Sequence, residues 1–317
     1  MVLAGDWKQA LPVIRKGSRG QIVHACLKRS ILWADTVPLS LTMNMRAQLG
    51  GGDLEFTNFL IRCGEGKLPI LSQKGQFTIK IPKKYHLDGT LDDLINWTFE
   101  GIRDIQLESD SGWIAARGII CPTNKGVDYI NNAVMQMFPG DEVLYRGYDS
   151  VDEDAHLYPT EFLNSLLPSG FPPNKLTLKL GCPIMLLRNL EPARGHCNGT
   201  KYIVQRLHTN IIEAAIADGA FRGNTILIPR IPMKPTDNVF PFELTRKQFP
   251  VRPSFGLTAN KSQGQTLAKV GIYAETPFFS HGQLYVAASR VGHGEKLKIM
   301  CGNNNGETDN VVYREIL

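Results

Sequence analysis

The spacing of apolar residues changes along the chain, and this separates helices from strands. Spacing along one face of a helix predicts helices at residues 22–27, 56–63, 91–100, 127–137 and 282–289. Short apolar runs, some of them alternating, predict strands at residues 2–6, 36–42, 115–121, 255–259 and 270–273. The strand at 115–121 is followed by a turn and a helix, which is half of a βαβ unit. The pattern therefore predicts a parallel sheet.

A different pattern occupies residues 149–230. Residues 149–174 are loop-like and contain four prolines. Short β-prone runs with glycine and asparagine turns follow at residues 176–180, 184–187, 202–207 and 225–228. Short strands at such close spacing are typical of a small antiparallel barrel. The predicted fold class is therefore α/β, with a parallel-sheet domain interrupted by a small antiparallel β-barrel.

Composition excludes several classes of protein. The 317 residues are 43% hydrophobic and 21% charged, which excludes a disordered or fibrous chain. No apolar run reaches the roughly eighteen residues of a membrane span, and the amino terminus lacks the features of a signal peptide. The six cysteines form no C-x-x-C pair, which favours reduced structural thiols over a disulfide or metal framework. We expect a soluble intracellular protein without a metal site or a membrane partner.

Charge is segregated along the chain, although the net charge is only +5. Residues 88–161 carry 4 basic and 15 acidic side chains, whereas residues 175–252 carry 12 basic and 5 acidic ones. Residues 1–35 add 6 basic and 2 acidic side chains. Two basic blocks around an acidic one are typical of a surface that faces a polyanion such as nucleic acid. The alternative is solvated faces with no partner.

Two segments place a polar side chain beside a predicted strand. Gln9 follows the strand predicted at 2–6, at the carboxyl edge where open α/β sheets bind ligands. Its amide can hydrogen-bond a phosphate oxygen and orient water, although an ordinary turn is the simpler interpretation of this segment alone. Arg46 ends the run at 41–46 and can supply positive charge to a phosphoryl group. A surface salt bridge is the simpler interpretation of a single arginine.

The most specific segment is residues 257–266, which bring hydroxyl, amide and ammonium groups around a glycine. Such a segment can present backbone N–H groups and Lys261 to phosphate oxygens of a nucleotide or of DNA. A structural turn does not need so many donors. At residues 284–292, small side chains allow close helix packing and Arg290 is expected to emerge at the helix end. Arg46 and Arg290 would then face one site.

Six motifs in one order resemble a known family. They are Gly-Asp-x-x-Gln-x-Leu-Pro-Val, Leu-Thr-x-Asn-Met-Arg, Pro-Thr-Asn, Asn-Gly-Thr, Lys-Ser-Gln-Gly-Gln-Thr and Ala-Ala-Ser-Arg-Val. In this order they resemble the Pif family of ATP-dependent DNA helicases over nearly the whole chain. The closing residues 310–317 most resemble the helicase encoded by Helitron transposons.

The resemblance implies a RecA-like parallel-sheet motor domain with an inserted Src-homology-like β-barrel. It places the end of a first motor domain at 1–35 and a linker at 151–174. The second motor domain would occupy 36–150 and 253–317, with the barrel at 175–252 between them. The basic barrel is implied to help grip the DNA strand along which the enzyme moves.

The resemblance also implies roles for individual residues. Gln9, Arg46 and Arg290 match catalytic residues that contact the γ-phosphate of ATP. Gly264 and Gln265 are expected to contribute to the nucleotide site. Single-stranded DNA would be bound by Thr258, Lys261, Ser262 and Gln263, and its backbone by Thr123 and Asn124.

One element of the family is missing from the sequence. No segment has the phosphate-loop pattern G-x-x-x-x-G-K-[ST]; residues 64–68 lack both its spacing and its hydroxyl. The acidic pair that holds Mg²⁺ should precede the Gln9 segment, where the chain begins. We therefore expect the carboxyl-terminal portion of a helicase, which is inactive alone although the complete enzyme would use ATP and Mg²⁺.

The family implies partners and a setting for the complete enzyme. It would move 5′-to-3′ on single-stranded DNA, unwind duplex and act at DNA junctions. The implied roles are DNA repair, recombination, telomere maintenance or transposon replication, in the nucleus. The missing first motor domain would be supplied in cis or in trans. The alternative is a catalytically inactive remnant that binds single-stranded DNA.

Overall fold

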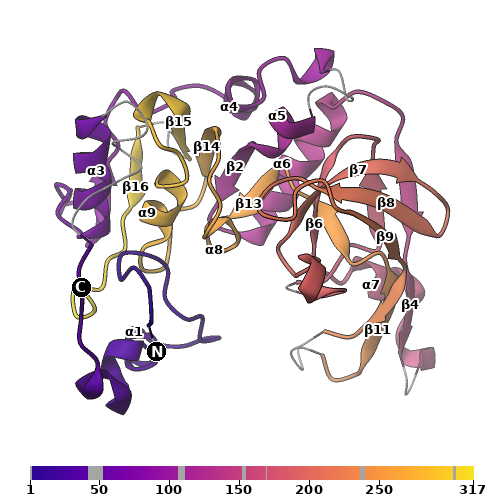
Figure 1. Ribbon diagram of the computed structural model, residues 1–317, viewed down its shortest axis with the longest axis horizontal. Coiled ribbons are helices and arrows are strands. Elements are labelled where there is room, and N and C mark those ends of the chain that lie inside the picture. Colours follow the sequence, from indigo (N-terminus) through magenta and orange to yellow (C-terminus); the bar gives the residue numbers. More distant parts are fainter. Residues whose placement is uncertain are drawn as a thin grey trace. The chain divides into compact units, whose positions relative to one another are not determined.

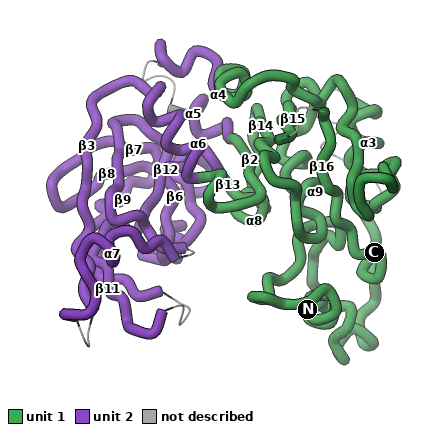
Figure 2. The backbone as a smooth tube through the Cα atoms, turned by 180° about the vertical axis from the view of Figure 1, so that it is seen from behind, with its two compact units in different colours: residues 1–98, 119–127, 257–317 green, residues 99–118, 128–256 purple. Residues whose placement is uncertain are grey.

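The structure is a computed structural model that describes residues 2–41, 53–105, 111–151, 155–168, 170–235, 240–302 and 305–317. It has a mixed α/β fold with a parallel and several antiparallel strand pairs (Figure 1). The chain forms two compact units, coloured in Figure 2. Unit 1 comprises residues 1–98, 119–127 and 257–317, and unit 2 comprises residues 99–118 and 128–256. None of the helices in the described part of the chain is long and apolar enough to cross a membrane.

Unit 1 is built on a four-stranded sheet with the strand order β13-β2-β14-β15. The strands are β13 (Gly256–Thr258), β2 (Arg117–Cys121), β14 (Lys269–Ala274) and β15 (Leu297–Cys301). The pair β14–β15 is parallel, with Val270 opposite Leu297, which agrees with the predicted parallel sheet. Nearly every residue of these strands is buried, which explains their continuous apolar runs.

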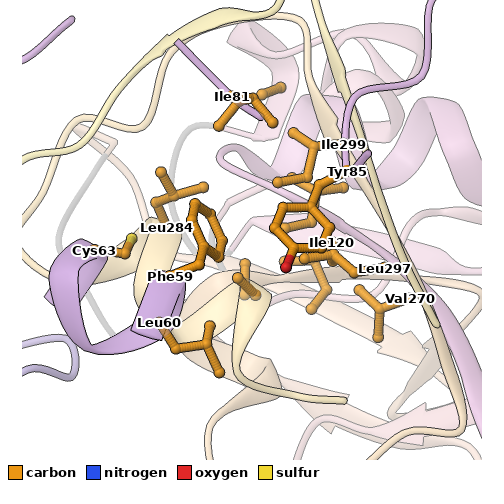
Figure 3. Packing of buried hydrophobic residues seen from close by; sticks show 14 of the residues in the cluster. Phe59, Leu60, Cys63, Ile81, Tyr85, Ile120, Val270, Leu284, Leu297 and Ile299 are labelled. Carbon is orange, nitrogen blue, oxygen red and sulfur yellow. The ribbon is translucent and has the colours of Figure 1, made fainter. Parts of the chain in front are cut away.

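The helices and remaining strands of unit 1 surround this sheet. They are α1 (Arg19–His24), α3 (Leu54–Gly64), β1 (Thr78–Lys80), α4 (Leu91–Thr98), α8 (Ala259–Ser262), α9 (Gln283–Ala288) and β16 (Glu307–Asp309), with 3-10 turns at Leu27–Arg29, Ile31–Asp35 and Gly294–Lys296. The carboxylate of Asp53 caps α3 by accepting the N–H of Phe56 at 2.9 Å. Figure 3 shows side chains of α3 packed towards Tyr85 and the strands, and the rings of Phe59 and Tyr85 lie 4.9 Å apart. This is the main core of unit 1.

Unit 2 is mostly antiparallel. Its five-stranded sheet has the order β12-β6-β7-β8-β9, with strands Val251–Pro253, Pro183–Leu186, Lys201–Leu207, Ile211–Ile216 and Thr225–Pro229. Two smaller sheets contain β10 (Ile231–Met233), β11 (Leu244–Gln248) and β4 (Tyr148–Val151), and β3 (Val143–Arg146) and β5 (Lys175–Leu178). The helices are α5 (Ser111–Ala115), α6 (Asn124–Met137), whose first turn belongs to unit 1, and α7 (Thr160–Ser165), with 3-10 turns at Ile102–Asp104, Ala155–Leu157 and Pro192–Arg194.

Three basic residues of the block 175–252 lie inside unit 2 and do not contribute to its surface charge. Lys179 donates to the carbonyl of Phe138 at 2.7 Å, and Arg246 forms a bidentate pair with Asp149. Burial lowers the pKa of the Lys201 amine to about 8. The basic block therefore presents less charge at the surface than its count of 12 basic residues indicates.

The structure confirms the predicted helices at 56–63, 91–100, 127–137 and 282–289, with shifted ends, and the strands at 115–121, 255–259 and 270–273. The helix predicted at 22–27 is α1 plus a 3-10 turn, and the predicted β-runs of residues 176–228 are β5, β6, β7 and β9. Their closure into a barrel stays a prediction, as do the domain boundaries.

Two predicted strands are wrong. Residues 2–6 and the described part of 36–42 pair with no strand of the described chain, and they are exposed. Val2 and Leu39 expose more than 90% of their surface. An apolar run becomes a strand only when a neighbouring strand supplies its hydrogen bonds, and local composition does not contain that information. Residues 151–174, expected to be a linker, contain α7, which packs through Leu163 on the core of unit 2.

Candidate functional site

Gln9 lies in a tight turn that begins at Asp6. The N–H of Gln9 donates to the Asp6 carbonyl at 3.0 Å. The Asp6 carboxylate accepts the N–H of Lys8 at 3.0 Å and the side-chain amide of Gln9 at 3.3 Å. Asp6 thus closes the turn through its backbone and side chain together, which is a common role of aspartate in turns. We call residues 6–9 the Gln9 turn.

The beginning of α9 holds the Gln9 turn. The hydroxyl of Tyr285 donates to the Asp6 carboxylate at 3.1 Å, and Nε2 of His281 lies 2.8 Å from the carbonyl oxygen of Trp7. Gly282 has φ +71°, and a Cβ atom there would lie 2.4 Å from the carbonyl oxygen of Lys8. The close approach of the two segments therefore requires glycine at position 282.

Gly282→Ala is expected to destabilise unit 1 more than Gly264→Ala does. Both glycines have φ between +70° and +80°, so each alanine costs about 1–2 kcal/mol of conformational strain. A Cβ at position 264 meets nothing within 4 Å, whereas one at 282 collides with the Gln9 turn. We expect Gly282→Ala to cost about 1 kcal/mol or more beyond its matched control, measured by urea unfolding. Equal losses in the two variants would contradict this packing.

A compact loop follows β13 and contains most of the predicted donors. Thr258 caps α8, because its hydroxyl accepts the N–H of Lys261 at 3.4 Å. The hydroxyl of the buried Ser262 donates to the Ala259 carbonyl at 2.7 Å. The side-chain amide of Gln265 donates to the Lys261 carbonyl at 3.1 Å. Lys261 itself is exposed and Gly264 turns the chain in the left-handed region, as the sequence segment suggests.

The structure brings Gln9 and this loop together. Nε2 of Gln263 lies 3.5 Å from Oε1 of Gln9 and 3.4 Å from the carbonyl oxygen of Ala10. Both glutamine side chains are partly buried. Two residues that are 254 positions apart in the sequence are therefore in direct contact.

Arg290 does not emerge at the helix end, contrary to the expectation from sequence. Its side chain is 4% exposed, and its guanidinium donates to the carbonyls of Val286, Ser262 and Gln265 at 2.7–3.3 Å and to the Ser289 hydroxyl at 2.8 Å. A buried guanidinium needs partners for its donors, and backbone carbonyls of the loop provide them. Arg290 thus fixes the shape of the Thr258–Gln265 loop.

The other predicted residues have separate positions. Thr123 follows β2, the neighbour of β13 in the sheet, and its hydroxyl accepts the N–H of Gly126 at 3.2 Å near the start of α6. Asn124 is exposed beside it. Arg46 and the run 42–46 lie outside the described residues, so the expected pairing of Arg46 with Arg290 stays a prediction.

Sequence reasoning missed His281 and Tyr285, whose side chains hold the Gln9 turn. His281 is fully buried, and its Nδ1 accepts the N–H of Tyr313 at 2.8 Å. A lone histidine before an apolar helix gives no signal of such contacts, because both partners are backbone groups distant in sequence. The polar residues Gln283 and Tyr285 within the predicted helix 282–289 were the available hint.

Comparison with known families gives two matches. Residues 1–74 match the family described as PIF1-like helicase, and residues 161–207 match the family described as DNA helicase Pif1, 2B domain. The first match contains the Gln9 turn, and the second contains all of α7 except its first residue and strands β5 to β7.

Curated relatives agree with these matches. The chain is similar to the ATP-dependent DNA helicase PIF1 of Xenopus laevis, with 28% identity over 60% of this chain and 28% of that protein. It is similar to the ATP-dependent DNA helicase PIF1 of Rattus norvegicus, with 26% identity over 95% of this chain and 40% of that protein. The chain therefore spans less than half the length of these relatives.

Solved structures share the fold. The Pif1 helicase of Candida albicans aligns with a TM-score of 0.64 at 21% identity, over 98% of this chain and 65% of that one. A Bacteroides Pif1 bound to single-stranded DNA aligns with a TM-score of 0.58 at 22% identity, over 94% of this chain and 61% of that one. The two family matches, the curated relatives and the shared fold agree, and in all three respects the chain is similar to PIF1-like helicases.

Proposed function

We propose that this chain is the DNA-handling portion of an ATP-dependent helicase that moves 5′-to-3′ on single-stranded DNA and unwinds duplex. The observation that carries the proposal is the contact between Gln9 and Gln263, which joins the Gln9 turn to the Thr258–Gln265 loop. The resemblance to the Pif family implies that the Gln9 turn senses the γ-phosphate and that the Thr258–Gln265 loop contacts DNA. Direct contact between them is the connection that coupling of hydrolysis to movement requires.

The exposed side of the loop supports DNA binding. Lys261 is exposed at the end of a segment whose backbone is fixed by Arg290, and Asn260 is exposed beside it. An ammonium group on a rigid loop suits the phosphates of a DNA strand. Asn124, exposed after the neighbouring strand β2, is proposed to contact the same backbone together with Thr123.

We propose that the residues of this chain do not form a complete site for ATP. No phosphate-loop segment is present in the sequence, and at least four donor contacts of Arg290 are used on carbonyl and hydroxyl groups of unit 1. The side-chain amide oxygen of Gln265 is buried and has no hydrogen-bond partner among the described residues, but an oxygen that only accepts hydrogen bonds does not suit a phosphate. We therefore propose that this chain alone does not hydrolyse ATP and that Mg²⁺ ligands lie outside it.

The exposed surface of residues 13–41 supports the proposal that another domain binds there. Seven large apolar residues in this segment each expose at least 39% of their surface: Val13, Leu27, Ile31, Leu32, Val37, Leu39 and Leu41. Such a concentration of exposed apolar residues is typical of a surface that another domain covers. The segment lies within the PIF1-like helicase match. We propose that the rest of a first motor domain covers it, in the same polypeptide or from another one.

The cellular location and biological role proposed here rest on the resemblance to the Pif family alone. We propose nuclear roles in DNA repair, recombination, telomere maintenance or the replication of Helitron transposons, with single strands and DNA junctions as substrates. A remnant that only binds single-stranded DNA is the alternative, and it also accounts for the absence of a phosphate-loop pattern from this sequence.

Single-stranded DNA binding by the full chain tests the proposal. We expect the logarithm of the affinity to fall linearly with the logarithm of salt concentration, measured by fluorescence anisotropy of a labelled oligonucleotide. Lys261→Ala should weaken binding and reduce the salt slope by about 1, because one phosphate contact is lost. Lys83→Ala is the matched control, since Lys83 is also an exposed lysine of unit 1. Equal effects of the two substitutions, or no binding by the unmodified chain, would refute the proposal.

A further inference from the structure

One of the contacts that hold the Gln9 turn comes from a fully buried side chain. His281 is fully buried, with Nε2 2.8 Å from the carbonyl oxygen of Trp7 and Nδ1 2.8 Å from the backbone nitrogen of Tyr313. A carbonyl oxygen only accepts and a backbone N–H only donates. Nε2 must therefore carry the proton and Nδ1 must be bare, so His281 is neutral. Burial agrees, because it lowers the pKa of this imidazole.

The carboxyl-terminal segment also contacts His281 and its neighbour Gly282. The N–H of Gly282 donates to the carbonyl of Val311 at 3.1 Å, and Tyr313 packs with Val23 and Trp7 in a small apolar cluster. Arg19 lies over the Tyr313 ring at 4.7 Å and pairs with Glu315 at 2.8 Å. Residues near both ends of the described chain thus meet at His281.

We infer that His281 is a positioning residue that holds the Gln9 turn against α9 and the carboxyl-terminal segment, so that Gln9 stays within reach of Gln263. What Gln9 then does in catalysis rests on the proposed function, but its placement does not. His281 touches no reacting group. It acts through the Trp7 carbonyl, two residues before Gln9.

Two conservative substitutions of His281 distinguish a role in positioning the Gln9 turn from a general role in stabilising the fold. His281→Gln keeps a donor near the place of Nε2 and can preserve the bond to Trp7. His281→Asn keeps an acceptor near the place of Nδ1 and can preserve the bond to Tyr313. A purely structural histidine would be affected similarly by both changes, whereas a positioning histidine requires the bond to Trp7.

The placement of Gln9 is measured by a disulfide. Gln9→Cys and Gln263→Cys are introduced together into the full chain, and the rate of disulfide formation under mild oxidation is followed by peptide mass spectrometry. Among the native cysteines only Cys197, in unit 2, is not buried, so background pairing is low. His86→Ala is the matched control, because His86 lies in unit 1 and its Nε2 is buried with no hydrogen-bond partner in the described part of the chain.

We expect His281→Ala and His281→Asn to slow disulfide formation roughly two- to tenfold, the effect of one lost hydrogen bond. His281→Gln and His86→Ala should leave the rate nearly unchanged. An unchanged rate in His281→Ala, or equal slowing in the Gln and Asn variants, would overturn the inference. If His281→Ala fails to fold, comparison of disulfide formation in His281→Gln and His281→Asn still tests the inference. The assay uses neither nucleotide nor DNA, so its outcome is independent of the DNA-binding test of the proposed function.

Discussion

Arg246→Met is expected to lower the free energy of unfolding of unit 2 by about 3–5 kcal/mol, because it leaves Asp149 buried and charged without its partner. Both side chains are fully buried. The guanidinium donates to the two oxygens of Asp149 at 2.6 and 2.8 Å. It also donates to the carbonyls of Leu163, Leu166 and Pro172, which belong to α7 and the segment after it.

Hydrogen exchange at β4 and β11 in urea measures this loss, since the two residues lie opposite each other on these strands. Arg206→Met is the matched control, because the Arg206 side chain is 72% exposed and its pair with Glu213 is at the surface. The double variant Arg246→Met with Asp149→Leu should recover much of the stability, since no charge is then left unpaired. A loss below about 1 kcal/mol in Arg246→Met would show that the network is not structural.

Arg290→Ala is expected to destabilise unit 1 by about 3 kcal/mol and to weaken single-stranded DNA binding in the same variant. The substitution leaves the carbonyls of Ser262 and Gln265 buried without their donor. The loop that carries Lys261 then loses its fixed shape. An arginine that only contacted nucleotide would leave both stability and DNA affinity unchanged in this chain.

Urea unfolding and oligonucleotide anisotropy on the same preparation check both parts. Arg29→Ala is the control, since Arg29 is an exposed arginine of unit 1. A stable Arg290→Ala chain with normal DNA affinity would contradict the role assigned to Arg290 in this loop.

Much of the fold could be predicted from the sequence, where local pattern and tertiary contacts agree. The apolar spacing of 56–63 and the continuous run at 115–121 correspond to α3 and β2, because these residues face one core. The runs at 2–6 and 36–41 also contain closely spaced apolar residues, but the described chain offers them no neighbouring strand. Their failure as strands reflects the absence of a pairing partner, which no local pattern reports.

The candidate site was only partly predictable. The Thr258–Gln265 segment has so many donors that its composition alone indicated a special loop. The contact of Gln9 with Gln263 was not predicted, since the two are 254 residues apart and no local pattern connects them. Burial of Arg290 could not be predicted, because the pattern shows an arginine at a helix end but not the carbonyls that surround it. The buried lysines and Arg246 likewise show that a count of basic residues does not give the charge of a surface.

The most direct test of the account is ATP hydrolysis by this purified chain, with and without single-stranded DNA. We predict no turnover in either condition while DNA binding is retained, and DNA-stimulated turnover once a first motor domain with a phosphate loop is joined to residue 1. Turnover by the chain alone would contradict the account, because the nucleotide would then be held by residues that form no phosphate loop.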